Sequence, residues 1–401
     1  MIYLDYNATT PVDARVLEAM LPYLGEAFGN ASSIHSAGQH ARAAVDVARE
    51  AVAQLVGAKT TEIVFTSGGT EADNLALLGT VEASGAARKH VITTAIEHHA
   101  VLNACQALER SGVEVTYVGA GRSGSVEPEE IRRAIRPETV LISVMHANNE
   151  IGSIQPVEEI GRIAAEADVV FHCDAVQSAG KLAIDVNRLG VDLLTISAHK
   201  IYGPKGVGAL YVRSGTAVEP QFFGGHHERD RRPGTENVPG IVGLGKAAEL
   251  ARKHLGEDAK RIAELRNRLE EALLQSIAAV RVNGDRKRRV SNTSNLTFAA
   301  AGGEALLIAL DLQGVACSTG AACSSGSVEA SHVLKAIGLS EEEARSSLRF
   351  SLGRGTTSEE IERAIEVILR VVERIRALSP VALEAEEVKE KNGASVVQKQ
   401  F

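Results

Sequence analysis

The sequence predicts an α/β protein with a mostly parallel sheet covered by helices on both faces, and with a second, smaller α+β domain. Between about residues 40 and 215, short β-rich runs alternate with helical patterns. Such alternation is typical of parallel strands joined by crossover helices. A second series of strands and helices follows after about residue 255. At 401 residues the chain also exceeds the usual size of a single hydrophobic core, so two domains are expected.

The elements of the first domain follow from periodicity. Helical spacing of apolar residues over 41–57 predicts a helix. Runs rich in β-branched and aromatic residues predict strands at 62–66, 89–95, 113–118, 139–145, 168–172, 192–196 and 208–213. No long helix separates the last two of these strands, so we expect one edge strand to be antiparallel.

The second domain begins within a long helical pattern at 240–277, which follows a loop rich in Gly, His and Arg at 224–235. We expect its further elements to be strands at 279–283 and 293–299, a helix at 303–313, a strand at 347–352, and a final helix that starts at a capping box of Thr357 and Glu360. With a boundary near 255, we assign 14–255 to a large domain, 1–13 and 256–385 to a small domain, and 386–401 to a flexible tail.

Composition and charge exclude several classes of protein. The chain is 44% hydrophobic and 23% charged, as in ordinary globular proteins, and its net charge is −8. This charge provides no general attraction to nucleic acids or anionic membranes, so we expect neither as a direct partner. No run approaches the about 20 apolar residues that a membrane-spanning helix needs, and the first residues have no secretion signal, so we expect a cytoplasmic protein.

Polar residues follow five of the predicted strands at the point where each strand ends. In a parallel sheet these ends share one edge, where ligands bind. The residues are Ser67-Gly68-Gly69-Thr70-Glu71, Glu97-His98-His99, His146-Ala147-Asn148-Asn149-Glu150, Asp174-Ala175-Val176-Gln177 and Ser197-Ala198-His199-Lys200.

Three of these strand ends have the groups that pyridoxal 5′-phosphate (PLP) requires. The small residues at 67–70 open a helix, so their backbone N–H groups can bind a phosphate, although taken alone they are an ordinary helix start. Lys200 can form a Schiff base, and Asp174 can hold a ring nitrogen protonated. Taken alone, Lys200 is a surface lysine and Asp174 a capping residue, but together with Asn149 and Gln177 they favour a PLP site.

Histidine and cysteine residues raise two further possibilities. His98, His99 and the pair His226-His227 follow no metal-binding spacing, so we expect no metal site. We expect the flat ring of His98 to stack on another flat ring and to carry protons near neutral pH. The four cysteines are too few for a disulfide scaffold. We expect Cys105 and Cys173 to be core thiols.

The segment 316–326 consists almost entirely of small residues, which is typical of a mobile loop. A thiol on such a loop can act as a nucleophile, and Cys323 is the candidate. For Cys317, near an apolar run, we favour a packing role, and disulfide formation or internal resolution of a persulfide stay open as alternatives.

Nine segments in order resemble the NifS/IscS-type cysteine desulfurases. They are LDYNATTPVD, FTSGGTEADNLA, EHHAVL, HANNEIGSIQPV, HCDAVQSAGK, SAHKIYGPKGVGALYVR, RRPGTENVPGIVG, STGAACSSG and SLRFSLGR. The resemblance covers about residues 2–380. It implies a class V, fold-type I PLP enzyme that is a homodimer.

The resemblance also implies roles for individual residues. Lys200 binds the cofactor and abstracts the substrate's Cα proton, Asp174 pairs with the ring nitrogen, Gln177 bonds the phenolic oxygen, and His98 stacks on the ring. Gly69, Thr70, Ser197 and His199 hold the phosphate, together with Thr235 of the other subunit. Asn149 and Arg349 bind the substrate carboxylate. Cys323 takes the sulfur of L-cysteine as a persulfide, leaving alanine, and can also ligate a transferred Fe–S cluster.

We therefore expect a desulfurase that supplies an Fe–S scaffold or another sulfur-acceptor protein, for cluster assembly or tRNA thiolation. A selenocysteine lyase or a class V aminotransferase is the close alternative, although an aminotransferase needs no thiol on a mobile loop. A non-catalytic scaffold protein would need none of Lys200, Asp174, His98 and Arg349. Two departures from the family pattern are Cys317 and the C-terminal tail.

Overall fold

A computed structural model describes residues 1–319 and 330–378, and its larger lobe contains a seven-stranded sheet of order β2-β8-β7-β6-β5-β3-β4. The strands are β2 (Ile63–Thr66), β3 (His90–Thr94), β4 (Glu114–Val118), β5 (Thr139–Ser143), β6 (Val170–Asp174), β7 (Leu193–Ser197) and β8 (Gly208–Val212). Neighbouring strands are parallel except where β8 meets β2 and β7. The α/β fold with a mostly parallel sheet is confirmed.

The expectation that the antiparallel strand lies at an edge is wrong. β8 returns from β7 through a short connection that contains Lys200, and β2 pairs on its other side. Gly208 permits this close pairing, since a Cβ atom there would lie 2.7 Å from the carbonyl carbon of Gly68. The sequence indicates that no crossover helix connects β7 and β8. It does not indicate that β2 pairs with the other edge of β8.

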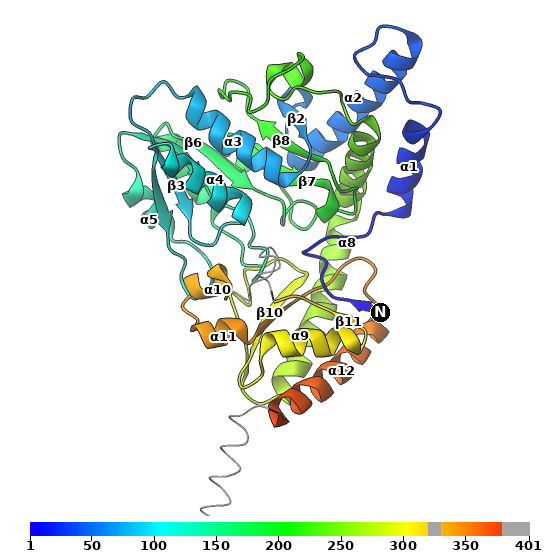
Figure 1. The fold of residues 1–401 in the computed structure, drawn as a ribbon, viewed down its shortest axis with the longest axis vertical. Coiled ribbons are helices and arrows are strands. Elements are labelled where there is room, and N and C mark those ends of the chain that lie inside the picture. Colours follow the sequence, from blue (N-terminus) through cyan, green and yellow to red (C-terminus); the bar gives the residue numbers. More distant parts are fainter. Residues whose placement is uncertain (320–329, 379–401) are drawn as a thin grey trace, which may run out of the picture.

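Helices cover both faces of this sheet. They are α1 (Ala14–Leu24), α2 (Ser36–Val56), α3 (Gly69–Ala83), α4 (His99–Arg110), α5 (Pro128–Ala134), α6 (Val157–Glu166) and α7 (Val186–Leu189), with 3-10 turns η1 (Thr60–Glu62), η2 (Ala198–Lys200) and η3 (His227–Asp230). Alternate strand residues enter separate cores: Leu141 packs with α3 and α4, whereas Ile142 packs with α2 and α6. Figure 1 shows α3 and α4 across the face of the sheet that is turned to the viewer. Helix α1 was not among the expected elements.

The smaller lobe is α+β, as predicted. It contains β1 (Ile2–Tyr3), the second half of α8 (Val238–Ser276), β9 (Val280–Val282), β10 (Thr293–Phe298), α9 (Gly303–Leu312), β11 (Val315–Ala316), α10 (His332–Ala336), α11 (Glu341–Arg345), β12 (Ser347–Ser351) and α12 (Ser358–Ala377). Strands β12, β10 and β9 form an antiparallel sheet, and β1 pairs in parallel with β11. The capping box of Thr357 and Glu360 is present at the start of α12.

Helix α8 is a single helix of 39 residues that belongs to two hydrophobic cores. Its first half, including Leu244, packs against the large sheet, and its second half, including Leu269, packs with Phe298 and Phe350. Figure 1 shows α8 running from the upper lobe into the lower one, where the N-terminus also lies. The chain therefore starts in the smaller lobe and reaches the larger lobe through residues 4–13.

None of the helices in the described ranges has the length and apolar character needed to cross a membrane. The predicted tail at 386–401 lies outside the described residues.

We expect Leu269→Ala to lower the free energy of unfolding by about 2–5 kcal/mol, because it leaves a cavity in the fully buried core of the smaller lobe. Urea unfolding followed by circular dichroism measures the change. Leu312→Ala on α9 is the matched control, since Leu312 is 78% exposed, and its effect should stay within about 0.5 kcal/mol. Equal effects of the two substitutions would contradict the assignment of Leu269 to this core.

Candidate active site

Lys200 lies in the turn that follows β7, at the carboxyl edge of the parallel strands. Its side chain is half-buried, and its Nζ donates hydrogen bonds to the carbonyl oxygens of Asn7 at 2.5 Å and Ala8 at 2.7 Å. Both acceptors belong to the N-terminal segment that connects the lobes. The lysine is therefore held in one place by the main chain.

Asp174 ends β6 and is buried. Its Oδ1 accepts a hydrogen bond from the Val176 N–H at 2.9 Å. Burial raises the pKa of Asp174 to about 6, while this hydrogen bond and the positive charge of Lys200 act in the opposite direction. A cationic group placed against this carboxyl would keep it ionised.

A second buried carboxyl group lies close to Asp174. Burial, followed by the charge of Asp174, raises the pKa of Asp73 on α3 well above its usual range. The ring of His172 contacts Asp73 at 3.6 Å and is hydrogen-bonded at both nitrogens, to Ser143 at 2.9 Å and Thr195 at 3.0 Å. Because two neighbouring carboxylates cannot both ionise cheaply in such a setting, we assign the negative charge to Asp174.

Asn7 joins several of the predicted site residues. Its carbonyl oxygen accepts from Lys200 and from the Gln177 Nε2 at 3.0 Å, and its Nδ2 donates to the Asn149 carbonyl at 3.0 Å. Asn7 is 1% exposed. Asn7 has no predicted role, because nothing local in a loop indicates partners more than 140 residues away.

Lys181 was also missed. Its Nζ donates to the Gln177 Oε1 at 2.7 Å and to the Asn7 Oδ1 at 3.3 Å. Residues 175–182 form turns and no helix, so the spacing of Gln177 and Lys181 along the sequence did not indicate this contact.

Arg349 reaches the site from β12 of the smaller lobe. Its Nη1 donates to the Asn149 carbonyl at 3.0 Å and its Nη2 to the Asp5 Oδ1 at 2.7 Å. The side chain is nearly fully buried. In the described part of the chain, the buried Oδ1 of Asn149 has no hydrogen-bond partner, so it is an acceptor available to a ligand.

Gly69 and Ser197 lie together beside Asp174. Helix α3 begins at Gly69, and its N-cap residue, Gly68, has no side chain to accept the first N–H groups. A Cβ atom on Gly69 would lie 2.9 Å from Val176 and 3.5 Å from Ser197. Thr70, also in the first turn, is exposed. These groups form a cradle at the positive end of a helix, where an anion can bind.

His98 and His199 are neutral rings. Burial lowers the pKa of both to about 4, and the charge of Lys200 contributes in each case. The Nδ1 of His98 accepts from the Ala100 N–H at 3.1 Å, which leaves its Nε2 to carry the proton. His199 is hydrogen-bonded to Thr9 at 3.1 Å.

The other predicted histidine and threonine positions lie elsewhere. His99 is exposed and its ring packs on His332 at 4.8 Å, while His226 pairs with Asp230. Thr235 is exposed and, with Ser67 and Gly206, lines a hollow of about 230 Å³. Across residues 1–319 and 330–378, no group of three or more His, Cys, Asp or Glu side chains is arranged to hold a metal ion.

Cys323 lies outside the described residues, but the described residues on both sides of segment 320–329 are hydrogen-bonded to Arg349 and to Glu150. Ser318 exchanges backbone hydrogen bonds with Arg349, at 3.2 and 2.6 Å. At the other end, the Ser331 hydroxyl donates to the Glu150 carboxylate at 2.5 Å.

The other three cysteines are buried. The prediction that Cys105 and Cys173 are core thiols is confirmed, and both are fully buried. Cys317 packs in the core of the smaller lobe, and burial raises the pKa of its thiol to about 12. It is a packing residue with little thiolate at neutral pH, as expected.

Comparison with known proteins identifies the fold and the family. The aminotransferase class-V family model matches residues 2–364. The chain belongs to this family.

Its class-V relatives include curated cysteine desulfurases. Cysteine desulfurase IscS of Dictyoglomus turgidum is 50% identical over 94% of this chain and 96% of its own length. Cysteine desulfurase IscS of Anaeromyxobacter sp. (strain Fw109-5) is 53% identical over 94% of each chain. The predicted resemblance to NifS/IscS-type desulfurases is confirmed.

Two solved structures show the same class-V fold. A NifS-like protein superposes with a TM-score of 0.88 at 37% identity, covering 93% of this chain and 99% of that one. SspA in complex with cysteine superposes with a TM-score of 0.80 at 40% identity, covering 89% of this chain and 100% of that one.

Glu97 follows β3 and is fully buried next to this site. Its Oε1 accepts from Thr94 at 2.6 Å and from the Met145 N–H at 3.0 Å, while no described residue is hydrogen-bonded to its Oε2. Burial raises the pKa of Glu97 to about 8, and the charge of Asp174 adds to this effect. The carboxyl group is therefore protonated at neutral pH.

We expect Glu97→Gln to make folding stability less sensitive to pH. The folded protein keeps this proton up to about pH 8, whereas in the unfolded chain the glutamate regains its ordinary pKa of 4.5 and releases the proton. The unfolded state thus binds fewer protons in this window, so wild-type stability falls as pH rises through it. Glu97→Gln carries no such proton and does not lose stability in this way. The difference between its free energy of unfolding and that of wild type should therefore rise by about 2–4 kcal/mol between pH 5 and pH 8.

Urea unfolding at the two pH values measures this change. Glu373→Gln on the exposed face of α12 is the control and should behave as wild type does. An unchanged difference between Glu97→Gln and wild type at the two pH values would mean that Glu97 is ionised in the folded protein.

Proposed function

We propose that this protein is a PLP-dependent cysteine desulfurase, which removes sulfur from L-cysteine, releases L-alanine and retains the sulfur as a persulfide. One observation carries the proposal. Lys200, Asp174 and Arg349 converge on one site, where Ser318, which precedes the segment that carries Cys323, is hydrogen-bonded to Arg349. The named activity of the relatives supports the same conclusion.

The residues present fit PLP. The cradle at Gly69 and Ser197 would accept the phosphate, and Gly69 has no room for a side chain, since its Cβ atom would lie 2.9 Å from Val176. We propose that Thr70 and His199 complete this phosphate site. Bound PLP would supply an electron sink that acidifies the Cα–H bond of the substrate.

Three residues of this chain would bind the cofactor ring. Asp174 supplies the anionic partner of the ring nitrogen, since its neighbour Asp73 takes the neutral form. Gln177 keeps an Nε2 hydrogen for the phenolic oxygen, because its Oε1 is occupied by Lys181. His98 presents a neutral ring with a proton on Nε2, which suits stacking and proton transfer.

Lys200 would remove the proton from the substrate Cα. Its amine must be in the neutral form for this task. Asn149 and Arg349 would bind the substrate carboxylate. The Nδ2 of Asn149 would donate to this carboxylate, since the amide Oδ1 can only accept, and the guanidinium of Arg349 would bind it from the smaller lobe.

Cys323 would be the sulfur acceptor. Its thiolate attacks the sulfur of bound L-cysteine, so that an S–S bond forms, the C–S bond breaks, and the electron pair of that bond stays on the carbon that becomes the methyl group of alanine. The burial of Cys317, Cys105 and Cys173 supports this choice. We propose that the persulfide then passes to an Fe–S scaffold or another acceptor protein.

We also propose the domain division and the dimer. The two cores along α8 support a large domain over 14–255 and a small domain over 1–13 and 256–385. Exposed Phe222 and Phe223, at 55% and 89% exposure, lie near Thr235 in sequence and support coverage by a second subunit, whose site Thr235 would complete.

Cys323→Ser should reduce sulfide release from L-cysteine by about 100-fold or more while the protein stays yellow, because the nucleophile is lost and the PLP site is untouched. Sulfide, alanine and the visible spectrum are measured with a reductant present. Cys317→Ser is the matched control and should keep both activity and colour.

If Cys323→Ser released sulfide at the wild-type rate, another residue would have to be the nucleophile. Colourless wild-type protein that takes up no PLP would contradict the proposed function itself. Amino transfer from cysteine to a 2-oxo acid would instead identify an aminotransferase, and a strong preference for selenocysteine would identify a selenocysteine lyase.

Arg349→Lys should raise the KM for L-cysteine by about 10–100-fold with a smaller effect on kcat, because an ammonium group cannot reproduce two parallel hydrogen bonds to a carboxylate. Steady-state kinetics measure both constants. Arg345→Lys on α11 is the control, since Arg345 pairs with Glu341 at the surface. An unchanged KM for Arg349→Lys would mean that the substrate carboxylate does not bind to Arg349.

A further inference from the structure

Tyr202 follows Lys200 by two positions and has a left-handed backbone conformation. Its φ is 68°, and among the described non-glycine residues with positive φ it is the only aromatic one. This conformation brings the Cβ atom of an L-residue close to a neighbouring carbonyl oxygen, so it is disfavoured for a bulky side chain. Contacts from the surrounding structure must therefore hold Tyr202 in place.

The conformation of Tyr202 closes the turn that carries Lys200. Two backbone N–H groups, one on each side of Tyr202, donate to the carbonyl oxygen of Ala198 at 3.0 and 2.9 Å. The N–H of Tyr202 donates to the Thr10 Oγ1 at 2.9 Å, and its carbonyl oxygen accepts from the Asp13 N–H at 3.0 Å. Lys200 lies within this turn, so a different backbone conformation at Tyr202 would move the lysine.

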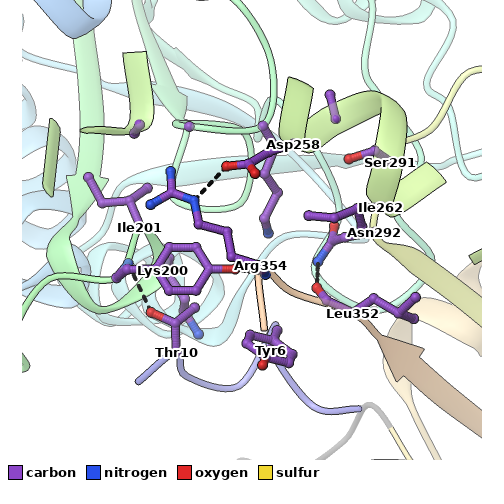
Figure 2. A pocket seen from close by; sticks show the side chains of 15 residues that line it. Tyr6, Thr10, Lys200, Ile201, Asp258, Ile262, Ser291, Asn292, Leu352 and Arg354 are labelled. Carbon is purple, nitrogen blue, oxygen red and sulfur yellow. Dashed lines mark hydrogen bonds and ion pairs between the residues drawn. The ribbon is translucent and has the colours of Figure 1, made fainter. Parts of the chain in front are cut away.

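Arg354, from the smaller lobe, covers the ring of Tyr202. Its guanidinium carbon lies 4.4 Å from the ring centroid, and its backbone N–H donates to the Tyr202 hydroxyl at 2.7 Å. The two side chains and Lys200 line a cavity of about 30 Å³, which has space for about one or two water molecules. Figure 2 shows Lys200 and Arg354 at this cavity. A cation over the face of a ring is attracted most strongly where water is scarce, as it is here.

Arg354 is itself fixed by helix α8. Its Nε donates to the Asp258 Oδ2 at 2.6 Å, an ion pair that Figure 2 shows. Its carbonyl oxygen accepts from the Arg261 Nη2 at 2.7 Å. Both partners belong to α8, which packs in the cores of both lobes. The guanidinium group is therefore held over the ring by a long and well-packed element.

We propose that Arg354 is a positioning residue whose guanidinium group stabilises the left-handed conformation of Tyr202 and thereby fixes the turn that carries Lys200. The inference deepens the proposed function, and its consequence for catalysis rests on that function. Because Arg354 belongs to the smaller lobe and Tyr202 to the larger one, the position of Lys200 then depends on the packing of the two lobes.

The first test follows hydrogen–deuterium exchange of residues 198–203, read by mass spectrometry, in the full-length protein freed of PLP. Arg354→Gln removes the cation and should speed exchange of the hydrogen-bonded amides of this turn about tenfold, as expected for loss of a poorly solvated cation–π contact. Tyr202→Leu removes the aromatic face but keeps a bulky side chain, and should speed exchange at least as much. The double variant should exchange no faster than Tyr202→Leu, because both substitutions remove the same contact.

Tyr202→Gly tests whether Arg354 acts through the backbone conformation of this residue. Glycine adopts positive φ without a steric cost, so the turn no longer needs support from a cation. In this background, Arg354→Gln should change the exchange of the turn less than twofold. An undiminished tenfold effect would mean that Arg354 acts through its ion pair with Asp258 alone, and would overturn the proposal.

Controls separate this effect from a change in global stability. Arg268→Gln removes another arginine of α8, which pairs with Glu362 at the surface, and should leave exchange of the turn unchanged. Thermal unfolding identifies a variant that does not fold, and if Arg354→Gln is such a variant, Tyr202→Leu decides the question. Exchange within twofold of wild type in the folded single variants would also overturn the proposal.

A second test measures steady-state kinetics of the PLP-loaded protein. Arg354→Gln should lower kcat for sulfide release about tenfold and change the KM for L-cysteine less than threefold, because Lys200 is displaced while the contacts to the substrate carboxylate stay. A tenfold rise of KM with unchanged kcat would mean that Arg354 binds the substrate, contrary to the proposal. Failure of the protein to take up PLP would refute the proposed function, while hydrogen exchange would still decide the role of Arg354.

Discussion

The hydrogen bonds of Asn7 are the contacts on which the site depends. One buried side chain and its carbonyl group meet Lys200 and Gln177 from the larger lobe and Thr293 and Asn292 from the smaller one. Because unpaired polar groups in such a place would cost about 1–3 kcal/mol each, the lobes fit together in the arrangement that satisfies them all. The substrate site is thereby built from both lobes at once.

Burial of charge explains the chemistry of the site. Removal of water lowers the pKa of His98 and of Lys181 and raises that of Glu97 and of Asp73, so burial favours the neutral form of each of these groups. Asp174 and Arg349 then provide separate negative and positive positions for a ligand. A cysteine desulfurase needs this contrast, because the ring nitrogen of its cofactor and the carboxylate of its substrate carry opposite charges.

The features that the sequence predicts correctly depend on neighbouring residues along the chain. Strand ends at 67–70, 174–177 and 197–200 could be located because β-rich runs and helical spacing alternate regularly, and the parallel sheet brings such ends together. The burial of Cys105 and Cys173 followed from strand and helix patterns. The role of Thr235 stays a prediction, because it depends on a second subunit, and Cys323 lies in a segment that the structure does not describe.

The sequence by itself determined the α/β class, the family and the residue types at the edge of the sheet, since each depends on periodicity or on short motifs. Only the tertiary structure decided that β8 lies inside the sheet, that Asn7 connects the lobes and that Lys181 shares its partners with Lys200. The physical reason is that these contacts join residues far apart in the sequence, as from Asn7 to Asn292, which are 285 positions apart. Packing between whole elements, and not local propensity, sets such distances.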